Sequence, residues 1–144
     1  MNSIFKHTEN NGEVIITGLQ EGTAETAIEI PETIDNMPVV AIGARAFRLT
    51  SIVDIRIGGN IRRIEDEAFS HCGKLISVKW NCKCNAIPDY CFYRCTKLKH
   101  FDFSAIKKVG QYAFRESGLQ EVCLPKNIEI PVSYTHLRAH ETDQ

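Results

Sequence analysis

Residues 64–80 read IEDEAFSHCGKLISVKW, and residues 87–103 read IPDYCFYRCTKLKHFDF. Both stretches begin with isoleucine, carry a phenylalanine after a small residue, and end in L-x-x-h-x-h, where h is apolar. Working outward along the chain, this phenylalanine recurs at intervals of 22, 23 and 22 residues, at Phe47, Phe69, Phe92 and Phe114. A fixed period of this length indicates a protein built from repeated coils that stack on one another.

The h-x-h endings have the period-2 alternation of short strands, so each repeat is predicted to contribute about one strand. The residues predicted to face the interior are Ile55 and Ile57, Val78 and Trp80, Phe101 and Phe103, and Val122 and Leu124. No segment carries a sustained 3.6-residue apolar stripe, and the A-F stretches have room for no more than short helical turns. The sequence therefore predicts a mainly β solenoid whose strands form a short parallel sheet.

These residues resemble the BspA-like leucine-rich repeat family, in which isoleucine, A-F, a small residue and L-x-x-h-x-h follow one another. The resemblance covers about residues 4–130, and IEIPETIDNMPVVAIGARAF at 28–47 is similar to part of the family's opening cap. It implies a leucine-rich repeat solenoid, a right-handed stack of coils of 22 or 23 residues with an N-terminal β cap. We expect the cap and first strand in residues 1–41 and about four repeats, the last incomplete, in residues 42–130.

The end of the chain departs from the repeat, because Pro131 stands where another apolar residue and an A-F turn are due. Residues 132–142, VSYTHLRAHET, resemble a one-frame translation of a sequencing-library adapter. We therefore predict that residues 131–144 are a non-native or disordered tail, in which His136 and His140 have no function. An unfinished last coil leaves an apolar face uncovered, which favours self-association through that end.

Charge and hydropathy exclude two classes of partner. The chain has 17 basic and 18 acidic side chains and a net charge of -1, which argues against nucleic-acid binding. No apolar run reaches the ~18 residues of a membrane helix, so no membrane insertion is expected.

Two predictions of the cellular location of the protein stay open. The family resemblance implies the cell surface or secretion, whereas the absence of a leader in this chain favours the cytoplasm.

Six cysteines raise the question of a metal site or a disulfide. Four of them, Cys72, Cys84, Cys91 and Cys95, fall in apolar or small-residue columns of the repeat and are expected in the core as free thiols. Cys72 and Cys95 lie on adjacent coils near disulfide distance, so their oxidation is the alternative. Cys82 falls in a loop and Cys123 on an outward strand position, so no metal site is assigned.

Motifs for catalysis are missing from the sequence. It contains no G-x-x-x-x-G-K-[ST], no H-E-x-x-H and no G-x-S-x-G, so a phosphate loop, a metalloprotease site and a nucleophile elbow lack their residues. His71 and His100 have no serine or carboxylate at a spacing that indicates a triad. We therefore predict that the protein is not an enzyme and assign no catalytic residue and no cofactor.

Outward residues of the predicted strands align into two columns on the sheet face. These candidate partner-binding residues, called the strand-face residues below, are Asp54, Ser77, His100 and Glu121 in one column and Arg56, Lys79 and Asp102 in the other. Such a shallow face of mixed charge favours recognition over catalysis. The prediction is a protein-interaction module that binds a protein or another macromolecule, with adhesion as one such role. The alternative is a structural spacer segment of a longer cell-surface protein.

Overall fold

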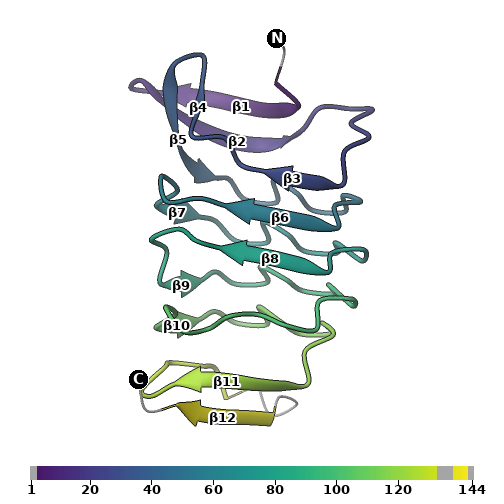
Figure 1. Ribbon diagram of the computed structural model, residues 1–144, viewed down its shortest axis with the longest axis vertical. Helices are drawn as coiled ribbons and strands as arrows, with labels where there is room; N and C mark the ends of the chain where they lie inside the picture. The colour runs from purple at the N-terminus through teal and green to yellow at the C-terminus, as the bar shows by residue number, and fades with distance from the viewer. Residues whose placement is uncertain (1–2, 133–137, 143–144) are drawn as a thin grey trace.

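The computed structural model describes residues 3–132 and 138–142, and those residues form strands and turns but no helix. Figure 1 shows coils stacked along one long axis, with the N-terminal hairpin at one end and β11 and β12 at the other. The prediction of a mainly β solenoid is confirmed. The twelve strands are β1 Phe5–Asn10, β2 Glu13–Leu19, β3 Ala27–Glu29, β4 Thr33–Ile34, β5 Met37–Ile42, β6 Asp54–Ile57, β7 Arg63–Ile64, β8 Ser77–Trp80, β9 Ala86–Ile87, β10 Lys108–Val109, β11 Glu121–Pro125 and β12 Arg138–Thr142.

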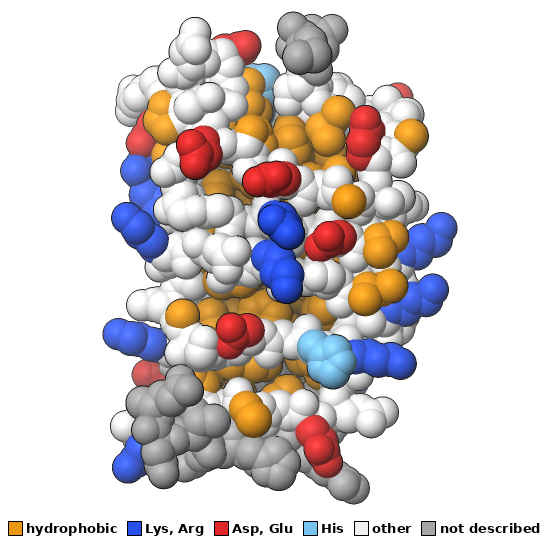
Figure 2. Space-filling model, viewed as in Figure 1, with side chains coloured by type: hydrophobic (Ala, Val, Ile, Leu, Met, Phe, Trp, Pro, Cys, Tyr) orange, Lys and Arg blue, Asp and Glu red, His pale blue; other side chains and the backbone are white. Residues whose placement is uncertain are grey.

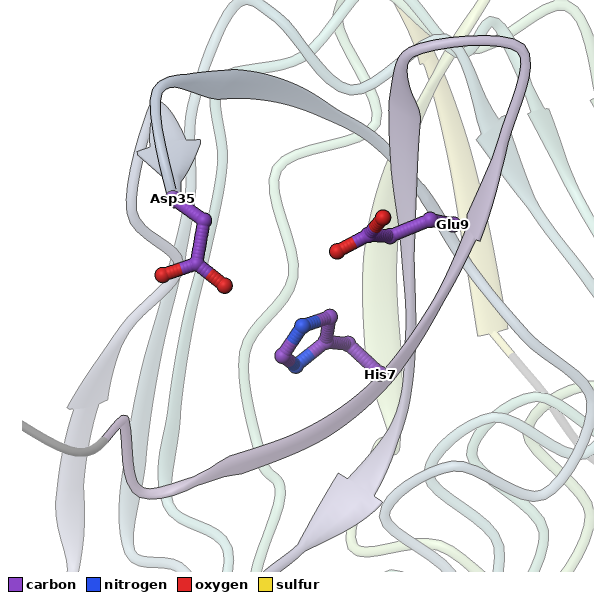
Figure 3. A group of neighbouring side chains, drawn as sticks. All are labelled: His7, Glu9 and Asp35. Atoms are coloured by element: carbon purple, nitrogen blue, oxygen red, sulfur yellow. The ribbon is translucent and has the colours of Figure 1, made fainter.

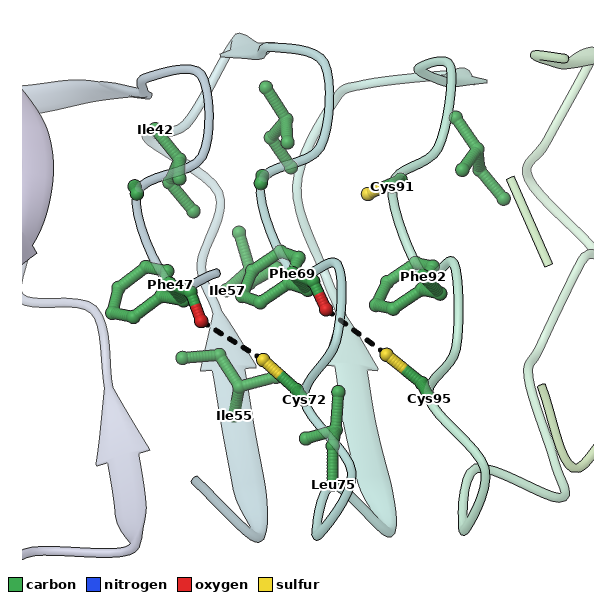
Figure 4. Packing of buried hydrophobic residues seen from close by; sticks show 14 of the residues in the cluster. Ile42, Phe47, Ile55, Ile57, Phe69, Cys72, Leu75, Cys91, Phe92 and Cys95 are labelled. Atoms are coloured by element: carbon green, nitrogen blue, oxygen red, sulfur yellow. Dashed lines mark hydrogen bonds between the residues drawn. The ribbon is translucent and has the colours of Figure 1, made fainter. Parts of the chain in front are cut away.

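The four repeat phenylalanines form one continuous ladder through the core. Ring centroids lie 5.3 Å apart between Phe47 and Phe69, 5.4 Å between Phe69 and Phe92, and 5.2 Å between Phe92 and Phe114. The rings are nearly parallel and fully buried, as Figure 4 shows for the first three. Because a step of 22 or 23 residues returns the chain to the same point of the next coil, like side chains stack on like.

The A-F stretches form single turns with hydrogen bonds between residues three apart, as when the Arg48 N–H donates to the Arg45 carbonyl at 3.1 Å, and none of them extends into a helix. Arg45 and Leu49 have φ values of 59° and 63°, on either side of the first A-F pair. Such left-handed residues interrupt a right-handed helix. The same spacing of two left-handed residues recurs in the next three coils, at Glu67 and His71, Tyr90 and Arg94, and Tyr112 and Glu116. The turn backbone also forms hydrogen bonds to the next coil, as when the Phe47 N–H donates to the Ala68 carbonyl at 2.8 Å.

The N-terminal cap is a five-stranded sheet in which β1, β2, β5 and β4 follow one another and β7 pairs with β5. An Asn11-Gly12 turn with positive φ at both residues joins β1 to β2, as two-residue hairpins require. A second turn with positive φ, Asp35-Asn36, joins β4 to β5. Phe5 of β1 covers the first rung of the ladder, with its ring centroid 6.4 Å from that of Phe47.

On the front of the solenoid, β3, β6 and β8 form a parallel sheet in the expected register. Ile55 of β6 lies beside Val78 of β8, and Ile57 lies beside Trp80. Ile55 and Ile57 are fully buried, whereas Val78 and Trp80 are half-buried. The inward alternation predicted from the sequence is therefore confirmed, and the inward side chains of β8 are more exposed to solvent than those of β6.

The predicted strand at Phe101–Phe103 does not form, so the front sheet ends at β8 and β11 pairs with β12 in a separate sheet. The Asp102 side chain accepts a hydrogen bond from the Ser104 N–H at 2.9 Å, a local bond that competes with strand pairing. The size of the Phe101 ring also disfavours strand pairing, because other coils carry aliphatic residues at this position. Its centroid lies 5.7 Å from that of Trp80 and 5.3 Å from that of Phe114.

All six cysteines are free. Cys72 and Cys95 are buried, and their thiols donate to the carbonyl oxygens of Phe47 and Phe69 at 3.0 Å and 3.1 Å, the bonds drawn in Figure 4. Cys91 is buried as expected, whereas Cys84 is only half-buried at the edge of the core. Cys84 keeps contact with its column neighbour, since its thiol donates to the Ile61 carbonyl oxygen at 3.9 Å, and its own carbonyl oxygen accepts a hydrogen bond from the Trp80 indole N–H at 2.9 Å.

The end of the chain has two described parts. Ile128 packs at the edge of the core, and the backbone of β12 pairs in parallel with β11, Glu121 lying beside Arg138. β12 belongs to the segment predicted to be a non-native or disordered tail. His136 lies outside the described residues, and the origin of residues 131–144 stays a prediction.

Over the described part of the chain, no helix has the length and apolar character needed to span a membrane.

Candidate interaction face

Four of the strand-face residues lie where the sequence places them. Asp54 pairs with Ser77 and Arg56 with Lys79 across β6 and β8, and Glu29 of β3 continues the second column. Figure 2 shows acidic and basic side chains interleaved down the middle of this face. No ion pair joins these charges to one another within residues 3–132. Arg56 and Lys79 are exposed, whereas Oδ1 of Asp54 is buried without a hydrogen-bond partner in the described structure.

Beyond β8 the structure departs from the predicted columns. Asp102 and His100 lie in the irregular segment before Phe103, and Glu121 lies on β11 in the next sheet. These three residues are exposed. The hydrogen bond from the Ser104 N–H lowers the pKa of the Asp102 carboxyl, which keeps it charged. The columns are therefore continuous over two coils and interrupted at the third.

This interruption opens a hollow of about 760 Å³ in the face, called the front hollow below. Its floor includes Val78, Trp80 and Phe101, all half-buried, and Figure 2 shows hydrophobic atoms at the surface between the charged side chains at this level. Five of the seven strand-face residues line it: Ser77, Lys79, His100, Asp102 and Glu121. Asp54 and Arg56 lie outside it, on the neighbouring strand.

The edge of β8 that faces this hollow has no strand beside it in the described part of the chain. Ser77 and Asn81 donate to Val53 and Ile57 on the side of β6. Because successive residues of a strand direct their backbone groups to opposite edges, the N–H and C=O groups of Val78 and Trp80 face away from β6. An edge of this kind can pair with an added strand.

Reading the sequence alone missed two features. The front hollow depends on the failure of one strand, and its signal was the pair of phenylalanines with Asp102 between them. A second hollow, of about 1070 Å³, lies beside the cap and includes His7 and Asp35 in its lining. His7, Glu9 and Asp35 bring their potential ligand atoms within 4.8 Å of one another. The alternation His7-x-Glu9 was a visible signal for two of these three residues.

Parallel coils of 22 or 23 residues, a buried phenylalanine ladder and strands aligned on one face define a leucine-rich repeat solenoid. The sequence profile of the BspA-type leucine-rich repeat region matches residues 21–136, in six copies. The chain therefore belongs to the BspA-type leucine-rich repeat family. The match extends past residue 130, the end that the sequence analysis gave to the repeats.

Solved structures give the same class. A leucine-rich repeat protein from Bacteroides ovatus is 25% identical with a TM-score of 0.78, over 90% of this chain and 36% of that one. A T. pallidum leucine-rich repeat protein is 26% identical with a TM-score of 0.74, over 88% of this chain and 61% of that one. A leucine-rich cell surface protein from Faecalibacterium prausnitzii shares the fold, with a TM-score of 0.80 at 19% identity, over 96% of this chain and 38% of that one.

The chain thus spans 36% and 61% of the length of the first two of these proteins. No curated protein matches the sequence.

Proposed function

We propose that the chain is a non-enzymatic protein-interaction module that binds a macromolecular partner through the strand-face residues, with the front hollow at the centre of the contact. The observation that carries this proposal is the convergence of five strand-face residues around a half-buried aromatic floor. An apolar centre that includes a tryptophan, surrounded by a charged rim, is the usual anatomy of protein interfaces. The unpaired edge of β8 suits an extended peptide segment of the partner.

A displayed library of random peptides is a direct probe for such a surface. We expect selection on the immobilised wild-type chain to enrich peptides, and the charge-reversed variant Asp54→Lys/Arg56→Glu/Lys79→Glu to lose them. The matched control is Glu32→Lys/Lys74→Glu/Lys97→Glu, which reverses one acidic and two basic exposed side chains outside the front hollow and so changes the net charge by the same amount as the face variant. Peptides that bind the face variant as well as the wild type would contradict the assigned face, and an equal loss in the control would indicate non-specific charge attraction.

The second candidate is a structural spacer in a longer surface protein. It is supported by the partial coverage of the solved relatives, which contain further length beyond the region that this chain matches. A spacer predicts that the library yields no peptide dependent on the strand face. It also predicts an export signal or another domain in the full-length gene, so sequencing the uninterrupted locus separates the two candidates. The same sequence tests whether residues 131–144 are encoded in the natural gene.

A surface location is part of the same proposal. The family and the cell-surface protein from Faecalibacterium prausnitzii support it. The direct measurement is protease accessibility of the chain on intact cells of the source organism, with a cytoplasmic protein as control. Degradation of the chain while the control stays intact is the expected result, and protection of both would place the protein inside the cell.

A further inference from the structure

Three side chains that can ligate a metal converge on the outer side of the cap. His7 and Glu9 lie two residues apart on β1, which places both on one face of the strand. Asp35 lies in the turn between β4 and β5, far from them in sequence. Figure 3 shows the imidazole and the two carboxylates directed toward a common space. Their ligand atoms all lie within 4.8 Å of one another.

Within residues 3–132 these three side chains take part in no hydrogen bond or ion pair. His7 is half-buried, and Glu9 and Asp35 are exposed. Two carboxylates at this separation repel each other, so the arrangement of the bare groups is electrostatically unfavourable. A cation placed between them would remove that repulsion and give all three groups a partner.

The surrounding charge favours a cation as well. His7 and Asp35 line the cap hollow of about 1070 Å³. Glu21 and Glu25 also line it, whereas no lysine or arginine does. A hollow lined by one sign of charge concentrates ions of the opposite sign. This feature of the hollow is independent of the geometry of the three side chains.

The distances allow metal coordination. Imidazole nitrogen and carboxylate oxygen bind first-row metals at about 2.0–2.2 Å, so two ligand atoms of one tetrahedral ion lie about 3.3–3.6 Å apart. A set within 4.8 Å has to close by no more than about 1.5 Å to reach this range, which rotation of the exposed Glu9 and Asp35 side chains allows. We propose that His7, Glu9 and Asp35 form a binding site for a divalent first-row transition metal ion.

The ligand set points to this class of ion. One imidazole with two carboxylates suits zinc, cobalt, manganese or iron, whereas the set has no thiolate to favour a soft ion. Three protein ligands leave further coordination positions for water or for a group of a partner. The site joins β1 to the β4–β5 turn, so the bound ion clamps the cap that covers the first rung of the ladder. It does not involve the front hollow.

Cobalt(II) is the probe of choice because its absorption spectrum distinguishes ligands. Nitrogen and oxygen ligands give weak visible bands, while thiolates add intense charge-transfer bands in the near ultraviolet. Titration of the whole chain is expected to give one site without thiolate bands and a higher unfolding temperature. A thiolate spectrum would assign the binding to the cysteines and overturn the proposal, and so would the absence of any cobalt-dependent spectrum.

Conservative variants test the residues. His7→Gln, Glu9→Gln and Asp35→Asn are each expected to weaken cobalt binding by at least about tenfold, since each removes one of three ligands. The matched control Glu21→Gln removes one negative charge from the same hollow without removing a ligand, and it should weaken binding less than about threefold. Equal losses in Glu9→Gln and Glu21→Gln would show diffuse attraction in place of a site. Wild-type binding by the triple variant, with an unchanged circular dichroism spectrum, would also overturn the proposal.

Discussion

Replacing Phe69 tests the packing of the ladder most severely. Its ring is fully buried between Phe47 and Phe92, with centroids 5.3 Å and 5.4 Å away and interplanar angles of 2° and 6°. Phe69→Ala removes the buried ring and leaves a cavity, which costs about 3–5 kcal/mol. Each stacked pair contributes a further ~0.5–1.5 kcal/mol, and the two effects overlap. We expect a loss of about 4–5 kcal/mol, a large part of the roughly 5–15 kcal/mol that stabilises a typical domain.

Urea unfolding is the assay, followed by circular dichroism and by the fluorescence of Trp80, the one tryptophan of the chain. Phe69→Leu keeps most of the volume and should cost less than about 1.5 kcal/mol, so it remains measurable if the alanine variant is unfolded without urea. The matched control is Ile76→Ala, whose side chain is 54% exposed, with an expected change within about 0.5 kcal/mol. A loss below about 2 kcal/mol for Phe69→Ala would refute a tightly packed ladder.

Two further predictions concern backbone contact and thiol chemistry. A Cβ at Gly110 would lie 2.6 Å from the Asp89 backbone nitrogen, so Gly110→Ala should lower stability by about 1–3 kcal/mol. Gly59→Ala meets no atom within 4 Å and should leave the urea midpoint nearly unchanged, and equal midpoints for the two variants would contradict the close approach of the coils. A hydrogen bond with the Cys84 thiol lowers the pKa of Cys82 to about 7, so alkylation of Cys82 should accelerate as the pH rises through that value. Burial raises the pKa of Cys91, which mass spectrometry should find unmodified until the protein unfolds, and rapid native labelling of Cys91 would be contrary to the structure.

The repeat could be predicted from the sequence because its cause is local and recurrent. When a phenylalanine recurs every 22 or 23 residues, stacking the coils buries each ring against the ring of the next coil, and the observed ladder has that form. The pairing of β6 with β8 follows from the same period. What the pattern omits is the size of each side chain and its side-chain-to-backbone bonds.

The predictions that were wrong and the features that were missed depend on side-chain size and on side-chain-to-backbone hydrogen bonds. The strand at Phe101–Phe103 was predicted from apolar alternation alone, and the Asp102 hydrogen bond and the aromatic bulk beside Trp80 are invisible to that rule. The left-handed turn residues were missed because they are not glycines. His7 and Asp35 come together through two hairpins of the cap, where no repeat relates one segment to the other.

The central claim is that like side chains of successive coils lie directly over one another. The most direct measurement is a nuclear Overhauser spectrum of protein with labelled phenylalanine rings. The account predicts an unbroken series of ring-to-ring contacts from Phe47 through Phe69 and Phe92 to Phe114, because adjacent centroids are 5.2–5.4 Å apart. A folded protein in which these rings show contacts only to other parts of the chain would contradict the stacked coils and the strand face built on them.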